Sequence, residues 1–83
     1  MIKVVLFASL REGLGVAEVE IAPTDICSVA DLIDGLSQRF GEVWRESLLA
    51  ENVLVAINQN MVNNEISVAD GDEVAFFPPV TGG

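Results

Sequence analysis

Residues 28–41 read SVADLIDGLSQRFG, and this stretch decides the fold because it holds the longest helical pattern in the chain. Its apolar residues recur three and four positions apart, which is typical of a helix with one buried face. Ser28 suits the N-cap, Asp31 suits both the capping box and the helix dipole, and Gly41 suits the position after the last turn. We therefore predict one amphipathic helix of roughly three turns. The residues of its apolar face are Val29, Leu32, Ile33, Leu36 and Phe40.

The segment before this helix is β-rich and is interrupted by glycines. Residues 1–10 contain many β-branched residues, and apolar residues alternate with glutamates over residues 16–22. Such alternation predicts strands. Gly13 and Gly15 lie between the two segments and allow a turn, so we expect a two-stranded hairpin at the start of the chain.

Short β-type segments also follow the helix. The expected elements are a helical turn over 42–50, a buried strand over 53–57, a short strand over 61–62 and a last strand over 73–77. The order β-β-α-β-(β)-β predicts an α+β protein of the β-grasp (ubiquitin-like) class, with a mixed sheet packed on one main helix. We expect a single domain over residues 1–83, of which residues 78–83 form a flexible carboxyl-terminal tail.

Composition excludes most classes of function. Thirteen acidic residues against four basic ones give a net charge of −9, which argues against nucleic acid and anionic membranes as partners. The chain has no histidine and one cysteine, Cys27, so it offers no His-based triad and no multi-cysteine metal site. We expect no bound metal or cofactor, a buried structural Cys27 and, because no apolar run is long enough to span a bilayer, a cytoplasmic protein.

Two phenylalanines are expected to share the open face of the sheet. Side chains alternate along a strand, so the residues of the first strand that face the helix leave Phe7 on the other face. In the last strand, Ala75 and Phe77 share that face. Clustered exposed aromatic residues usually mark an interface, which predicts a partner-docking patch with Arg11 as its polar rim. The alternative is that a loop covers these rings or that they are isolated on the surface.

Residues 78–83, PPVTGG, predict a functional tail. The two prolines lack an N–H group and end the sheet, and residues 79–83 could extend at most about 17 Å. The two glycines would fit a narrow channel and leave the carboxyl group of Gly83 accessible. A carboxylate becomes electrophilic only after activation, typically by ATP on a separate enzyme, and sulfide or persulfide then gives a thiocarboxylate. These features predict a carrier rather than a catalyst, whereas the alternative is a frayed end.

The chain resembles the small, sulfur-carrier subunits of molybdopterin synthase. The resemblance is most specific over residues 70–83, DGDEVAFFPPVTGG, which fit the terminal motif of that family throughout. Phe7 with Arg11-Glu12, and residues 55–59 (VAINQ), are also similar. Residues 22–52 are similar in pattern alone.

The resemblance implies a β-grasp fold and a carboxyl-terminal glycine that an E1-like enzyme adenylates with ATP. Gly83 would then become a thiocarboxylate and, with Gly82 providing clearance, deliver sulfur to cyclic pyranopterin monophosphate in the large synthase subunit. Two small and two large subunits would form a heterotetramer. Together with the patch described above, the expected partner contacts are Phe7, Arg11, Ala75, Phe77, Pro78, Pro79, Val80 and Thr81.

Three other functions remain open at this point. A thiamine-pathway sulfur carrier shares the fold and the Gly-Gly end, but such carriers usually lack the Phe-Phe-Pro-Pro stalk and tend to be shorter. A ubiquitin-like modifier would join its terminal carboxyl group to lysines of other proteins. A plain β-grasp interaction domain would make no use of its carboxyl terminus.

Overall fold

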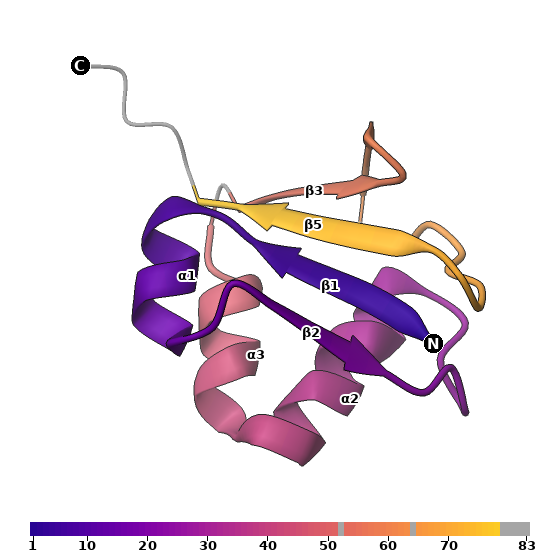
Figure 1. Ribbon diagram of the computed structural model, residues 1–83, viewed down its shortest axis with the longest axis horizontal. Helices are drawn as coiled ribbons and strands as arrows, with labels where there is room; N and C mark the ends of the chain where they lie inside the picture. Colours follow the sequence, from indigo (N-terminus) through magenta and orange to yellow (C-terminus); the bar gives the residue numbers. More distant parts are fainter. Residues whose placement is uncertain (52, 64, 79–83) are drawn as a thin grey trace.

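The computed structural model describes residues 1–51, 53–63 and 65–78, which build a mixed five-stranded sheet with its helices on one face (Figure 1). Along the chain the elements are β1 (Ile2–Leu6), α1 (Ala8–Leu14), β2 (Glu18–Ile21), α2 (Val29–Phe40), α3 (Glu42–Leu48), β3 (Leu54–Ile57), β4 (Asn60–Val62) and β5 (Glu73–Phe77). The strands are ordered β2-β1-β5-β3-β4. The parallel pairing of β1 with β5 brings the first and last strands together at the centre of the sheet. The predicted α+β, β-grasp class is confirmed.

The main helix begins and ends as its sequence predicts. The Ser28 side chain accepts a hydrogen bond from the N–H of Asp31 at 3.2 Å, and the Asp31 carboxylate accepts one from the N–H of Cys27 at 3.0 Å. These two bonds satisfy N–H groups that the helix itself leaves free. Gly41 follows the last residue with φ of 120°, which favours glycine. Phe40 is the exception on the predicted apolar face, because it is 39% exposed and stacks on Trp44 instead.

The core lies between the sheet and the helices. It is built from the inward-facing residues of β1 and β5 and the apolar face of α2. Burial of each such side chain contributes about 1.5–3 kcal/mol. The most completely buried residues are Ile2, Val4, Leu6, Val29, Leu32, Ile33, Leu36, Val74 and Phe76.

The chain between the first two strands forms a helix, so the prediction of a simple hairpin turn was wrong. β1 ends at Leu6, and α1 carries the chain to β2, which pairs antiparallel with β1. Leu10 is buried and Leu14 packs at the edge of the core, and residues four apart share one face of a helix. Gly15 ends α1 with φ of 81° and donates its N–H to the carbonyl of Arg11. A seven-residue helix is too short to produce a clear periodic pattern.

Two further expectations are corrected. Cys27 is exposed rather than buried, because the adjoining Ile26 points into the core and the extended chain turns the next side chain outward. The third strand begins at Leu54, one residue later than expected, and the Leu54 side chain is 44% exposed, whereas Val55, Ala56 and Ile57 are buried as predicted. No helix within the described ranges is both long and apolar enough to cross a membrane.

Candidate functional site

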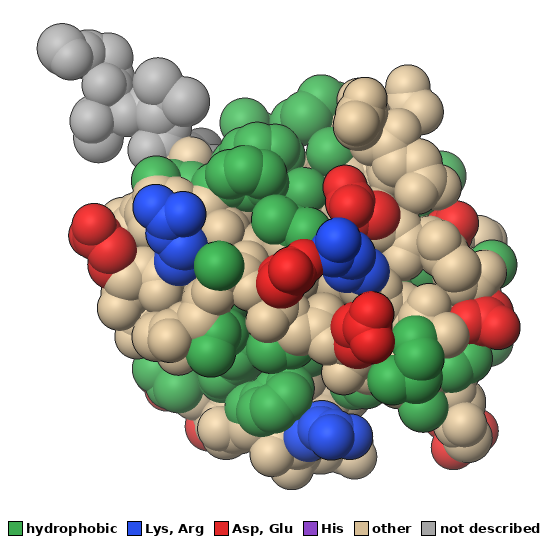
Figure 2. Space-filling model, viewed as in Figure 1, with side chains coloured by type: hydrophobic (Ala, Val, Ile, Leu, Met, Phe, Trp, Pro, Cys, Tyr) green, Lys and Arg blue, Asp and Glu red, His purple; other side chains and the backbone are tan. Residues whose placement is uncertain are grey.

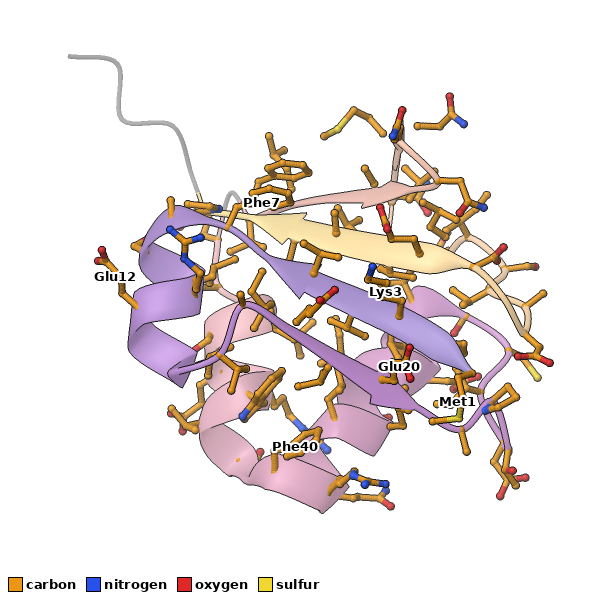
Figure 3. All side chains as sticks on the ribbon, in the orientation of Figure 1. Met1, Lys3, Phe7, Glu12, Glu20 and Phe40 are labelled. Atoms are coloured by element: carbon orange, nitrogen blue, oxygen red, sulfur yellow. The ribbon has the colours of Figure 1, made fainter. Side chains whose placement is uncertain are left out.

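Phe7 and Phe77 lie together on the face of the sheet that the helices leave open, as their sequence positions predict. The parallel register pairs Leu6 with Phe76, which point into the core, so the next residue of each strand points outward. The two rings stack with centroids 4.7 Å apart and planes 4° apart. Phe7 remains 40% exposed, so no loop of the described chain covers the pair (Figure 3).

The rings belong to a larger apolar surface that crosses four strands. Leu54 on β3 pairs with Phe77, while Ala75 lies between Val5 on β1 and Ala56 on β3. Figure 2 shows hydrophobic side chains gathered on this face beside the end of the described chain. We call this surface the apolar patch. It consists of Val5, Phe7, Leu54, Ala56, Met61, Ala75 and Phe77.

The sequence interpretation missed two of the most exposed members of the apolar patch. Leu54 is 44% exposed and Met61, which pairs with Ala56, is 59% exposed. Strict alternation from the buried Val55 would have placed Leu54 on the open face. Conversely, Ala75 is on the predicted face but is only 9% exposed, so it offers a partner little surface.

The backbone between β1 and α1 holds Phe7 in place. Its N–H donates to the carbonyl of Phe76 at 3.3 Å, which continues the ladder one residue beyond β1. Its carbonyl accepts the N–H of Leu10 at 3.1 Å and of Arg11 at 3.5 Å. Ala8 then takes φ of 49°, a left-handed conformation that turns the chain into α1. Arg11 therefore lies one helical turn from Phe7, is exposed, and is placed to form the predicted polar rim.

The other end of the same sheet face is charged. Lys3 pairs with Glu73 across β5 and with Glu20 across β2. Its ammonium group lies 3.1 Å from the Glu18 carboxylate and 3.9 Å from that of Glu73. The hydrogen bond from Lys3 to Glu18, and the negative charges of Glu18, Glu73 and Glu20, raise the pKa of Lys3 above its usual 10.5. Figure 2 shows basic and acidic side chains over the middle of this face, beside hydrophobic ones, and Figure 3 labels Lys3 and Glu20.

The tail starts at the edge of the apolar patch. Pro78 directly follows Phe77, is half-buried and ends the described chain. Because it has no N–H group, it cannot extend the ladder of β5. The remaining predicted tail residues lie outside the described residues: Pro79, Val80, Thr81, Gly82 and Gly83. The structure thus describes the surface next to the tail and the point at which the tail begins.

A second feature, a shallow hollow of about 540 Å³, lies on the helical side of the molecule. It is lined by residues of the β2–α2 loop and of α2, including Asp25, Asp34 and Arg39. None of its lining residues belongs to the apolar patch. Among the residues that the structure describes, no group of three or more acidic or cysteine side chains is placed to hold a metal ion.

Comparison with known proteins agrees with this geometry. Residues 4–83 match the model of the ThiS family. The chain belongs to that family. Two proteins named molybdopterin synthase sulfur carrier subunit, from Haemophilus influenzae and Escherichia coli, are 41% and 42% identical to it over 83 residues, which cover the whole of both chains. The solved structure of SAMP1 from Haloferax volcanii superposes with a TM-score of 0.81 at 30% identity, covering 99% of this chain and 98% of that one.

These ThiS-family comparisons confirm the resemblance found in the terminal motif. The match extends over residues 22–52 as well, where the sequence shows only a pattern of helix and strand.

Proposed function

We propose that this ThiS-family chain is the sulfur-carrier subunit of a molybdopterin synthase, with the carboxyl group of Gly83 as its reacting group. The observation that supports it most is full-length identity of 42% to a sulfur carrier subunit. The position of the apolar patch beside the tail adds a physical reason, since a partner that binds the patch also receives the tail.

The chemistry requires two partners. An E1-like enzyme would transfer AMP from ATP to the Gly83 carboxylate, releasing pyrophosphate. Sulfide would then attack the acyl carbon, and AMP would leave with the electron pair of the broken C–O bond. With a persulfide as donor, its terminal sulfur would attack in the same way and give an acyl disulfide. A second thiol would then break the S–S bond, forming a disulfide with the donor and releasing the thiocarboxylate. The thiocarboxylate formed would carry its sulfur into the large synthase subunit, for transfer to cyclic pyranopterin monophosphate. The chain itself would bind neither ATP nor a metal and would supply no catalytic side chain.

The apolar patch would serve as the docking surface for the large subunit. Phe7, Phe77 and Leu54 offer flat aromatic and aliphatic area that becomes buried on association. From Pro78, the tail could then extend up to about 17 Å into a cleft of the partner. Gly82 and Gly83 would pass a narrow channel because they have no side chains. Two copies of each subunit would form the heterotetramer, in the cytoplasm.

Intact mass of the protein isolated from cells tests this function. A sulfur carrier should show a fraction with one oxygen replaced by sulfur, and fragmentation should place the sulfur at Gly83. Co-purification of a pterin-synthesising subunit would identify the pathway. Absence of the sulfur form from cells that make molybdenum cofactor would contradict the proposal, and recovery with thiamine-pathway enzymes would favour that alternative.

A protein modifier is the second candidate, because the structurally similar SAMP1 is small archaeal modifier protein 1. A modifier would attach Gly83 to lysines of other proteins through amide bonds. Covalent conjugates on denaturing gels of cell extracts would support it, and their absence together with the sulfur form would exclude it.

A further inference from the structure

Lys3 is the only lysine in the 83 residues. The other basic side chains are arginines, whose guanidinium groups stay protonated and are poor nucleophiles. The single lysine lies on the open face of the sheet, where its ammonium group is 3.1 Å from Glu18 and 3.9 Å from Glu73. An activated carboxyl terminus reacts with amines, so the chain offers few side chains with which its own activated terminus could react.

The consequence concerns self-modification and depends on the proposed function. When Gly83 is activated as an acyl-adenylate, any neutral amine can attack its acyl carbon. The nitrogen lone pair forms the C–N bond, the C–O bond to AMP breaks, AMP leaves with that electron pair, and the nitrogen loses a proton to solvent. A carrier with free lysines would therefore couple to other copies of itself and lose its reactive end.

The contacts of Lys3 oppose this reaction. An ammonium group has no lone pair to donate, and the two carboxylates favour the ammonium form over the neutral amine. They also hold the side chain along the sheet surface. Because both partners are partly exposed to water, this protection is modest in size.

The position of Lys3 adds a second protection. Val5, two residues along the same strand face, belongs to the apolar patch, so a protein docked on the patch reaches the immediate surroundings of Lys3. Activation takes place while the chain is bound to an enzyme, and a second copy of the chain would then have restricted access to this amine.

We infer that this chain limits the acylation of its own side chains: its one lysine is held between Glu18 and Glu73 beside the proposed docking surface, which favours reaction of activated Gly83 with sulfur and with acceptors other than this lysine. Lys3, Glu18 and Glu73 thus determine acceptor specificity without contacting the reacting carbon of their own chain. The inference applies equally to a sulfur carrier and to a modifier, which would then attach singly and not build chains through Lys3.

The test uses the full chain bearing a carboxyl-terminal thioester, made by intein cleavage, and incubated alone at about pH 8.5, below the usual pKa of lysine. Mass spectrometry of the intact protein measures the amounts of covalent dimers and cyclised chains. Peptide mapping then assigns each amide bond to Lys3 or to the amino terminus. The comparison variants are Glu46→Lys, which adds an exposed lysine outside the ion pairs of the described residues, Glu18→Gln/Glu73→Gln and Lys3→Arg.

We expect Lys3 to be acylated about threefold or more slowly than the lysine introduced at position 46. Glu18→Gln/Glu73→Gln should remove most of that difference, and Lys3→Arg should leave only amino-terminal products. Equal rates at positions 3 and 46, or no change in the double variant, would overturn the inference. The thioester is made chemically, so this result is independent of whether cells convert Gly83 to a thiocarboxylate, and the two proposals can fail separately.

Discussion

Phe7 and Phe77 stack face to face at a centroid distance of 4.7 Å, although one follows the first strand and the other ends the last. The parallel pairing of β1 with β5 creates this contact, and the same pairing places the start of the tail beside both rings. One piece of sheet geometry therefore places the proposed docking surface next to the start of the tail.

Replacing Phe77 by aspartate should weaken binding to the large synthase subunit by at least about tenfold, because a charge would be buried at the centre of the interface. Isothermal titration calorimetry would measure the change. Phe40→Asp is the control, since Phe40 is an exposed phenylalanine that lies by α3 on the helical side. Normal complex formation by the Phe77 variant would show that the apolar patch is not the docking surface.

Leu54→Asp should also weaken this complex, by about three- to tenfold, because Leu54 pairs with Phe77 and widens the apolar patch. Leu49→Asp provides the control: Leu49 has a similar exposed fraction but follows α3. If the two variants bind equally well, the interface is confined to the phenylalanines and the tail.

Addition of one residue after Gly83 should abolish sulfur transfer, because the enzyme that activates the chain would meet the wrong carboxyl group. The melting temperature should not change, since the tail begins beyond the last strand. An assay of molybdopterin formation with the purified large subunit would measure transfer. Undiminished activity of the extended chain would remove the proposed mechanism.

Asn58 is expected to stabilise the turn that joins β3, which carries Leu54, to β4, which carries Met61. It has φ of 50°, and its side-chain oxygen accepts the N–H of Glu73 at 3.0 Å. Asn58→Ala should lower the free energy of unfolding by about 1–2 kcal/mol, since it loses the hydrogen bond and retains the strained backbone. Asn58→Gly should lower the free energy of unfolding by less than Asn58→Ala does, because glycine adopts positive φ readily. Urea denaturation would show the order, and a larger loss for glycine would contradict this account.

The ion pairs of Lys3 predict an alkaline dependence of stability. Because the pKa of Lys3 is raised in the folded state, the stabilisation is fully present below the unfolded value of 10.5 and is lost as pH rises through the folded value. Lys3→Gln should therefore melt at a lower temperature than the unmodified chain at neutral pH, and this difference should shrink above about pH 10.5. Added salt should reduce it as well. A difference independent of both pH and salt would exclude an electrostatic origin.

Local patterns predicted much of this molecule because their physics is local. The caps of α2, for example, depend on residues only a few positions apart. Side-chain alternation alone placed Phe7 and Phe77 on the open face.

Tertiary structure decided what depends on contacts between distant segments. The sequence by itself determined α2, the last strand, the acidic surface and the glycine-terminated tail. The chain after β1 forms α1 rather than a simple turn, because the core of the folded protein buries Leu10. The exposure of Leu54 and Met61 required the strand order, and the ion pairs of Lys3 required β2 and β5 on either side of β1. Such contacts join residues far apart in the chain, so no short stretch of sequence contains the information that forms them.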